Sequence, residues 1–285
     1  MSLHSPASDP PMKLGVYRVL SAQAGVRISP MMLDAMSVIN CFKLLDPYFD
    51  MGGNFIDTAN GYQDGSSKEF IGEFNYVRNS SKSLYLSVEP SLKKLHMDYS
   101  NILYLHWWDC DTSIHDLMDN LHYLVSLRKV LYLGISDAPA WVVAQANQCT
   151  LDYRKKPFLV YQGWWNIMMR SFEREIILMT RVFGMALVPW DVLTAGRFRT
   201  DEEDQKRKET GEKGRTISHP DWERNEFEIV ASEVGVQGNT NAGVRNRYVM
   251  HKTPYVFPII GGRKFSQAIG HIEILIAHEH SLEPE

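Results

Sequence analysis

An aspartate and a tyrosine five residues apart could together carry out acid catalysis. Asp57 and Tyr62 lie in the segment DTANGY, residues 57–62, directly after a short apolar stretch. A tyrosine hydroxyl can give a proton to an oxygen that is becoming an alkoxide, which contributes ~10²–10⁴-fold to a rate. A phenol with a pKa of about 10 needs a nearby cation for this role, and a carboxylate can hold that cation. The spacing is also typical of a turn carboxylate beside a surface phenol.

A histidine and two tryptophans follow the apolar run at residues 101–106, where they could bind a substrate. His106 ends this run, and a neutral imidazole there can hydrogen-bond a substrate carbonyl. Trp107 and Trp108 would line a pocket suited to a flat aromatic molecule. A histidine satisfied within the core and ordinary core packing of the two indoles are the alternatives.

Groups that could hold a nucleotide recur later in the chain. Trp190 could stack on a planar ring. Arg263 and Lys264 stand where a last helix begins, and two cations at a helix N-terminus make a phosphate site, although exposed basic residues also occur there. Polar side chains that could hydrogen-bond an amide follow two other apolar runs, namely Ser136, Asp137 and Gln162.

Alternating strands and helices must position these groups. Apolar runs predict strands over residues 54–57, 101–106, 130–136, 158–162, 185–188 and 255–260. Amphipathic periodicity and capping residues predict helices over residues 66–74, 80–95, 113–127, 139–149, 172–183, 223–234, 241–251 and 264–277. This order indicates a parallel sheet, and the number of units favours a (β/α)8 barrel. Such a barrel places its chemistry at the C-terminal ends of its strands. No Gly-x-Gly-x-x-Gly follows a strand, which counts against a Rossmann domain.

Composition indicates an ordinary folded protein that acts on a small molecule. The 285 residues include 30 basic and 34 acidic side chains, so the formal net charge is −4 and no basic run indicates nucleic-acid binding. Three cysteines fit neither a disulfide framework nor a zinc pattern, and no two histidines fall at strand ends as metal ligands would. No secretory signal or membrane span is apparent, so we expect a cytoplasmic protein. We expect a flexible arm at residues 1–13 and a single domain at residues 14–285, which opens with a hairpin of residues 14–20 and 26–28.

Several segments carry a resemblance to a known family. They are GGNFIDTANGYQDGSSKEFIGE, YLHWWD, YLGISDAPAWVVAQAN, VYQGWWN, MALVPWDVL and FPIIGGRK. Together they resemble the aldo-keto reductases, especially the fungal aryl-alcohol dehydrogenase branch, which includes norsolorinic acid reductases of mycotoxin pathways. The resemblance implies an eight-stranded barrel that binds NADP(H) and reduces aromatic aldehydes or ketones by hydride transfer.

The resemblance also assigns roles to individual residues. Tyr62 corresponds to the acid, Asp57 to its carboxylate partner and a cofactor contact, and His106 to the residue that orients the carbonyl. Trp107 and Trp108 join His106 as substrate contacts. Contacts to the nicotinamide amide fall on Ser136, Asp137 and Gln162, and the stacking ring on Trp190. Contacts to the phosphates of NADP(H) fall on Asp191, Val192, Leu193, Thr194, Ala195, Gly196, Arg197, Gly262, Arg263, Lys264 and Gln267.

The chain departs from the family pattern in one region. The family has a Lys at the end of the third strand, but here Phe74 runs directly into Asn75, and roughly thirty residues, including that strand, have no counterpart. A shortening near residues 37–41 also places Pro47 inside the first barrel helix, where proline costs about 3 kcal/mol or forces a kink. We therefore expect an incomplete barrel, in which either another segment takes the third position or an open seam remains. Two functions stay open: a reductase, and a cofactor-binding relic with impaired catalysis.

Overall fold

The computed structural model describes residues 14, 15, 17–34, 41–59, 79–194, 205, 209, 229, 230 and 248–261. The strands are β1 (Arg18–Ser21), β2 (Ala24–Ile28), β3 (Met32–Asp34), β4 (Ile56–Asp57), β5 (Ser100–Leu105), β6 (Val130–Ser136), β7 (Phe158–Trp164), β8 (Ala186–Trp190) and β9 (Ile259–Ile260). The helices are α1 (Cys41–Asp50), α3 (Ser81–Leu95), α4 (Ile114–Ser126), α5 (Ala140–Tyr153) and α6 (Phe172–Val182). The predicted arm at residues 1–13 and the predicted helix at residues 66–74 lie outside the described residues.

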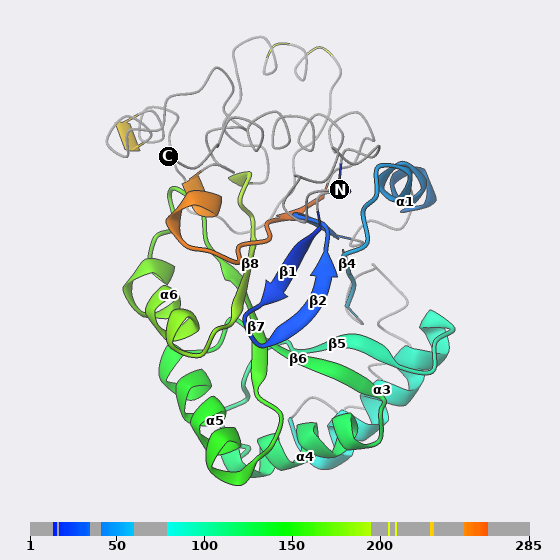
Figure 1. The fold of residues 1–285 in the computed structure, drawn as a ribbon, viewed down its shortest axis with the longest axis vertical. Helices are drawn as coiled ribbons and strands as arrows, with labels where there is room; N and C mark the ends of the chain where they lie inside the picture. Colours follow the sequence, from blue (N-terminus) through cyan, green and yellow to red (C-terminus); the bar gives the residue numbers. More distant parts are fainter. Residues whose placement is uncertain are drawn as a thin grey trace, which may run out of the picture.

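The strands from β3 to β9 form one parallel array. One sheet has the order β5-β6-β7-β8 and another the order β4-β3-β9. A parallel bridge between Leu187 of β8 and Val256, just before β9, joins the two sheets. Helices α4, α5 and α6 lie along the outer side of the β5–β8 sheet (Figure 1). This is the alternation of a (β/α) barrel, as the sequence predicts.

The two ends of this array are β4 and β5. Within the described part of the chain, no backbone pairing joins these two strands. The helix that follows this position in the chain, α3, is nevertheless present, and its Val88 and Leu92 are buried in the same core as α4. The described fold thus keeps a helix beside a place in the barrel where the expected third strand would stand.

The β1–β2 hairpin covers the N-terminal end of the barrel. Its Leu20, Ala24 and Ile28 pack with inward-facing residues such as Val160 and Val188. At the turn, the Gln23 side chain donates a hydrogen bond to the carbonyl of Phe183, just before β8, at 2.8 Å. Among the described residues, the hairpin thus packs against the interior side chains at this end of the barrel.

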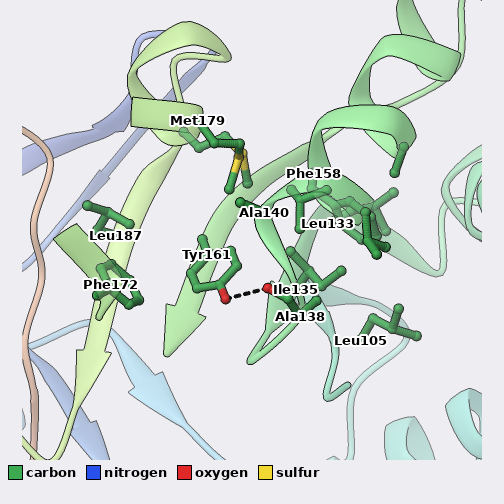
Figure 2. Close-up of a cluster of buried hydrophobic side chains, with 14 of the residues drawn as sticks. Leu105, Leu133, Ile135, Ala138, Ala140, Phe158, Tyr161, Phe172, Met179 and Leu187 are labelled. Carbon is green, nitrogen blue, oxygen red and sulfur yellow. Dashed lines mark hydrogen bonds between the residues drawn. The ribbon is translucent and has the colours of Figure 1, made fainter. Parts of the chain in front are cut away.

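A second core lies between the outer face of the sheet and its helices. Figure 2 shows Tyr161 of β7 among apolar residues of β6, α5 and α6, with its hydroxyl directed at the turn after β6. That hydroxyl donates to the carbonyl of Ala138 at 2.7 Å, and both groups are buried. The bond fixes the turn that carries Asp137, one of the predicted site residues.

The glycine in the middle of β6 makes room for an aromatic ring inside the barrel. A Cβ atom at Gly134 would lie 2.6 Å from two ring carbons of Tyr104, its register partner on β5. We expect Gly134→Ala to lower the free energy of unfolding by about 1–3 kcal/mol through overpacking, as measured by chemical denaturation. Gly25→Ala is the matched control, since nothing lies within 4 Å of its added Cβ. Equal losses in the two variants would contradict this packing.

Several predicted boundaries need correction. The sequence analysis missed β3, because three residues are too few to show a period, and its hairpin began too early, since β1 runs from Arg18 to Ser21. β7 and β8 each extend two residues further than predicted and end at Trp164 and Trp190, which are register partners. Pro47 lies inside α1, as expected. In the described part of the chain, no helix is long and apolar enough to cross a membrane.

Candidate active site

The structure places the described site residues at the C-terminal ends of neighbouring strands. Asp57 ends β4, Ser136 ends β6 and Trp190 ends β8, while His106 directly follows β5. Gln162 lies two residues before the C-terminal end of β7. The other described members of the predicted set are Trp107, Trp108, Asp137, Asp191, Val192, Leu193 and Thr194. The predicted residues Tyr62, Ala195, Gly196, Arg197, Gly262, Arg263, Lys264 and Gln267 lie outside the described residues.

Two tryptophans and two aspartates connect the ends of β6, β7 and β8. The rings of Trp164 and Trp190 stack with their centroids 5.3 Å apart and their planes 10° from parallel. The indole N–H of Trp190 donates to Asp137 Oδ2 at 3.0 Å, and that of Trp164 donates to Asp191 Oδ2 at 2.9 Å. We call these four residues the tryptophan clamp. Since each indole is both stacked and hydrogen-bonded, the clamp presents a fixed aromatic surface at the barrel rim.

Asp137 holds the clamp from an unusual backbone conformation. Its φ is 45°, in the left-handed region that aspartate tolerates better than most residues. Its backbone N–H donates to the carbonyl of Gln162 at 3.0 Å, and its Oδ1 accepts from the backbone N–H of Trp164 at 3.2 Å. The Ser136 hydroxyl also donates to Oδ2 at 3.3 Å. These bonds fix the carboxylate between the ends of β6 and β7.

The electrostatic surroundings of Asp137 act in two directions. Partial withdrawal from water raises the pKa of the carboxyl above its ordinary value, although the residue keeps solvent-exposed surface at the rim. The hydrogen bonds from Trp190, Trp164 and Ser136, together with the charge of His106, oppose this rise.

Gln162 offers a hydrogen-bond donor without a partner. The residue is 6% exposed, and its Nε2 atom is buried with no acceptor in the described structure. A buried unsatisfied amide costs about 1–3 kcal/mol, so such groups in native proteins call for an explanation. An oxygen atom of a ligand at the barrel mouth would satisfy this donor.

A carboxylate and a phenol lie inside the barrel on the two strands that end the array. Asp57 on β4 is 8% exposed. The hydroxyl of Tyr104 on β5 is buried without a hydrogen-bond partner in the described structure. Burial, and after it the charge of Asp57, raise the pKa of Tyr104 well above its ordinary value. The raised pKa keeps the Tyr104 phenol protonated, and its buried hydroxyl has no acceptor within the described structure.

The loop after β5 presents an exposed histidine and an aromatic wall. The rings of His106 and Trp107 have centroids 5.1 Å apart, and Trp107 is 64% exposed. Trp108 meets Trp141 of α5 edge to face at 5.5 Å, and its indole N–H donates to the carbonyl of Thr112 at 3.2 Å. Trp107 thus presents a flat apolar surface beside His106, whereas Trp108 packs against α5.

Asp109 fastens this loop to the start of α3. Its carboxylate accepts from the backbone N–H groups of Asn79 at 2.7 Å and Thr112 at 2.9 Å, and from the Thr112 hydroxyl at 2.9 Å. The Asn79 side chain returns a bond to the carbonyl of Trp107 at 3.0 Å. Burial tends to raise the pKa of Asp109, but these hydrogen bonds outweigh it and hold the pKa below its ordinary value.

We expect Asp109→Ala to destabilise the fold by about 1–3 kcal/mol, because three backbone donors, those of Asn79, Asp111 and Thr112, lose their acceptor. In the native protein this contribution is fully present above about pH 4, the unfolded pKa, and is lost as pH falls through the lowered folded pKa. Denaturation at neutral and acidic pH measures both effects. Asp111→Ala, in the exposed part of the same loop, is the control and should change stability little. A variant of Asp109 as stable as the native chain at neutral pH would contradict the assignment.

Sequence analysis assigned no role to Trp164 or Tyr104. Trp164 ends β7, two residues beyond the predicted strand, and Tyr104 lies within β5. The alternation of β7 carries the signal for Trp164, since residues 160, 162 and 164 share one face of a strand. Among the described residues, no group of three or more His, Cys, Asp or Glu side chains could hold a metal ion.

Comparisons with known proteins agree with this arrangement. The profile of the Aldo/keto reductase family matches residues 74–279. A protein of Phanerodontia chrysosporium named aryl-alcohol dehydrogenase (NADP(+)) is 42% identical over 100% of this chain and 87% of its own length. A putative aryl-alcohol dehydrogenase of Saccharomyces cerevisiae is 41% identical over 96% of this chain and 86% of its own. A norsolorinic acid reductase of Aspergillus flavus is 39% identical over 94% and 79%.

The Phanerodontia protein also contains residues that have no counterpart here. Its alignment runs over 341 positions, whereas this chain has 285 residues, so about 56 positions (341 − 285) are gaps in this chain. The relative therefore has one or more segments that this chain lacks.

Proposed function

Because the chain belongs to the aldo/keto reductase family, we propose that it is an NADP(H)-dependent oxidoreductase that reduces an aromatic aldehyde or ketone by hydride transfer. The observation that carries this proposal is the Nε2 atom of Gln162 at the C-terminal end of the barrel, which is buried and has no hydrogen-bond partner in the part of the chain that the structure describes. It lies beside Ser136 and Asp137 and within the same rim as Trp190. The carboxamide of a nicotinamide accepts hydrogen bonds from donors such as the Gln162 amide. Its flat ring can stack on an indole such as that of Trp190.

The described residues fit the nicotinamide half of NADP(H). The Gln162 amide and the Ser136 hydroxyl would bind the carboxamide, and the Trp190 indole would support the ring. When bound, NADPH supplies the hydride. For the rest of the cofactor we propose Asp191 to Arg197 and Gly262 along the pyrophosphate, and Arg263, Lys264 and Gln267 at the 2′-phosphate.

Three residues would act on the substrate carbonyl. The His106 imidazole would hydrogen-bond the carbonyl oxygen and orient it, as its exposed position at the rim permits. Tyr62 would give the proton to that oxygen as the hydride arrives at carbon, and Asp57 would shape the field around the phenol. The family has a lysine beside this tyrosine, at the end of its third strand, and we find no counterpart of it in this sequence. We therefore expect slow turnover of the carbonyl substrate.

An aromatic substrate suits the indoles beside His106. Trp107 and Trp108 would pack on the substrate ring. Similarity to aryl-alcohol dehydrogenases supports a benzylic aldehyde, and similarity to norsolorinic acid reductases supports an aromatic polyketide of a fungal mycotoxin pathway. The two types share an aromatic carbonyl, which is the chemistry we assign.

A direct assay tests this function. The purified chain is mixed with NADPH and an aromatic aldehyde, and the oxidation of NADPH is followed with and without the aldehyde. We expect aldehyde-dependent oxidation, and a His106→Ala variant should be slower. Aldehyde-independent traces alone would overturn the proposed activity.

A cofactor-binding relic is the second candidate. It is favoured by the lack, among the described residues, of a strand paired between β4 and β5, and by the gaps in the alignment. It predicts NADPH binding without turnover. The genomic sequence between the codons for Phe74 and Asn75 would distinguish such a relic from a shortened form of an active reductase. An intron that translates into a strand ending in lysine would show that this chain is a shortened form of an active reductase.

A further inference from the structure

The tryptophan clamp contains a carboxylate at the edge of the proposed nicotinamide site. Asp137 directly follows Ser136, and its backbone N–H bonds to the Gln162 carbonyl, so the carboxylate lies next to both proposed carboxamide ligands. Its Oδ2 is also bonded to the Trp190 indole. A negative charge is therefore fixed beside the aromatic surface that would support the ring.

We propose that Asp137 makes the site prefer NADP⁺ to NADPH. This inference rests on the proposed function. The oxidised nicotinamide ring is a cation, whereas the reduced ring is neutral, so a fixed carboxylate stabilises only the oxidised ring. The Trp190 indole acts in the same direction, because tryptophan attracts cations through its negative face.

The second aspartate of the clamp is less suited to this role. Asp191 Oδ2 accepts from the Trp164 indole at 2.9 Å and lies 3.4 Å from the Asn166 amide nitrogen. The Asn166 amide also donates to the Asp191 carbonyl at 3.2 Å. These contacts fix Asp191 behind Trp164, whereas Asp137 bonds Trp190 and adjoins Gln162. Asp137 is therefore the carboxylate that faces the proposed ring position.

This preference has a consequence for the direction of the reaction. A site that binds NADP⁺ more tightly than NADPH makes the bound reduced cofactor a stronger hydride donor than the free one, by linkage between binding and redox state. The hydride passes to the carbonyl carbon and the proton to its oxygen, which leaves NADP⁺ beside Asp137. The clamp would thus favour reduction on the enzyme, with release of NADP⁺ as a slow step.

The test compares the dissociation constants of NADP⁺ and NADPH for the native chain and for Asp137→Asn, measured by calorimetry. The variant removes the charge and keeps one acceptor oxygen. We expect the ratio of the NADP⁺ constant to the NADPH constant to rise roughly tenfold, which equals about 1.4 kcal/mol. Asp137→Ser, a second neutral replacement of different shape, should shift the ratio in the same direction.

Two controls separate charge from position. Trp190→Phe removes the indole N–H and leaves the carboxylate. It should weaken both redox forms and raise the ratio much less than the neutral variants of Asp137 do, because phenylalanine attracts a cation only somewhat less than tryptophan. Asp111→Asn makes the same change of net charge at an exposed position and should alter neither constant. An unchanged ratio in both neutral variants of Asp137 would overturn the inference. Failure of the native chain to bind either form would instead overturn the proposed function.

Discussion

A Tyr62→Phe variant is expected to reduce an aromatic aldehyde ~10²–10⁴-fold more slowly than the native chain, because the proton for the carbonyl oxygen loses its donor. The dissociation constant of NADPH should stay unchanged, since the phenol acts on the substrate oxygen rather than on the cofactor. Steady-state kinetics with NADPH and an aryl aldehyde, together with a binding titration, measure both quantities.

Tyr85→Phe provides the matched control for this change. Tyr85 is 51% exposed on α3, so loss of its hydroxyl should leave turnover at the native value. Equal rates for the native chain and Tyr62→Phe would remove Tyr62 from the mechanism. With intact NADPH binding and no turnover in any of the three proteins, the second candidate function would hold.

Gln162→Leu is expected to separate stability from affinity. The native amide has a buried nitrogen without a partner, so an apolar side chain of similar size should leave the free energy of unfolding unchanged or raise it by about 1 kcal/mol. The same variant should bind NADPH about tenfold more weakly, because the carboxamide loses a donor of about 1.4 kcal/mol. Denaturation of the free protein and a cofactor titration measure the two effects.

Asn147 on α5 shows what a structural amide does by contrast. It is 1% exposed, donates to the Phe158 carbonyl at 3.0 Å and accepts from the Phe158 N–H at 2.9 Å. Asn147→Leu should therefore destabilise the chain by about 2–4 kcal/mol, since two buried backbone groups lose their partners. Cofactor affinity of the remaining folded protein should not change. A similar loss of stability in Gln162→Leu would mark Gln162 as a structural residue instead.

The sequence predicted the long elements of the fold well. Strands such as β6 and β7 are continuous apolar runs between clear turn signals, and helices such as α4 have both a regular apolar period and a serine cap whose side chain accepts from the backbone at Asp116. Because a barrel carries its chemistry at the C-terminal ends of its strands, the sequence could predict that Gln162, Trp190 and His106 lie at or beside strand ends, as they do. Their roles stay predictions.

The remaining features depend on contacts between segments distant in the chain. β3 has three residues and is defined by its pairing with β4 and β9, which no local pattern reveals. The link between Trp190 and Asp137 joins residues 53 positions apart, so the sequence assigned Asp137 only to the cofactor and did not foresee its bond to the indole. The fit between Tyr104 and Gly134 likewise appears only when β5 and β6 pair.

A titration of the folded chain with NADPH tests the central claim most directly. If the C-terminal strand ends bind the reduced dinucleotide, tryptophan fluorescence should change saturably and the thermal unfolding midpoint should rise with NADPH concentration. The Gln162→Leu variant should need about ten times more NADPH for the same change. A flat titration of the native chain, with no shift of the midpoint at saturating concentrations, would contradict the account.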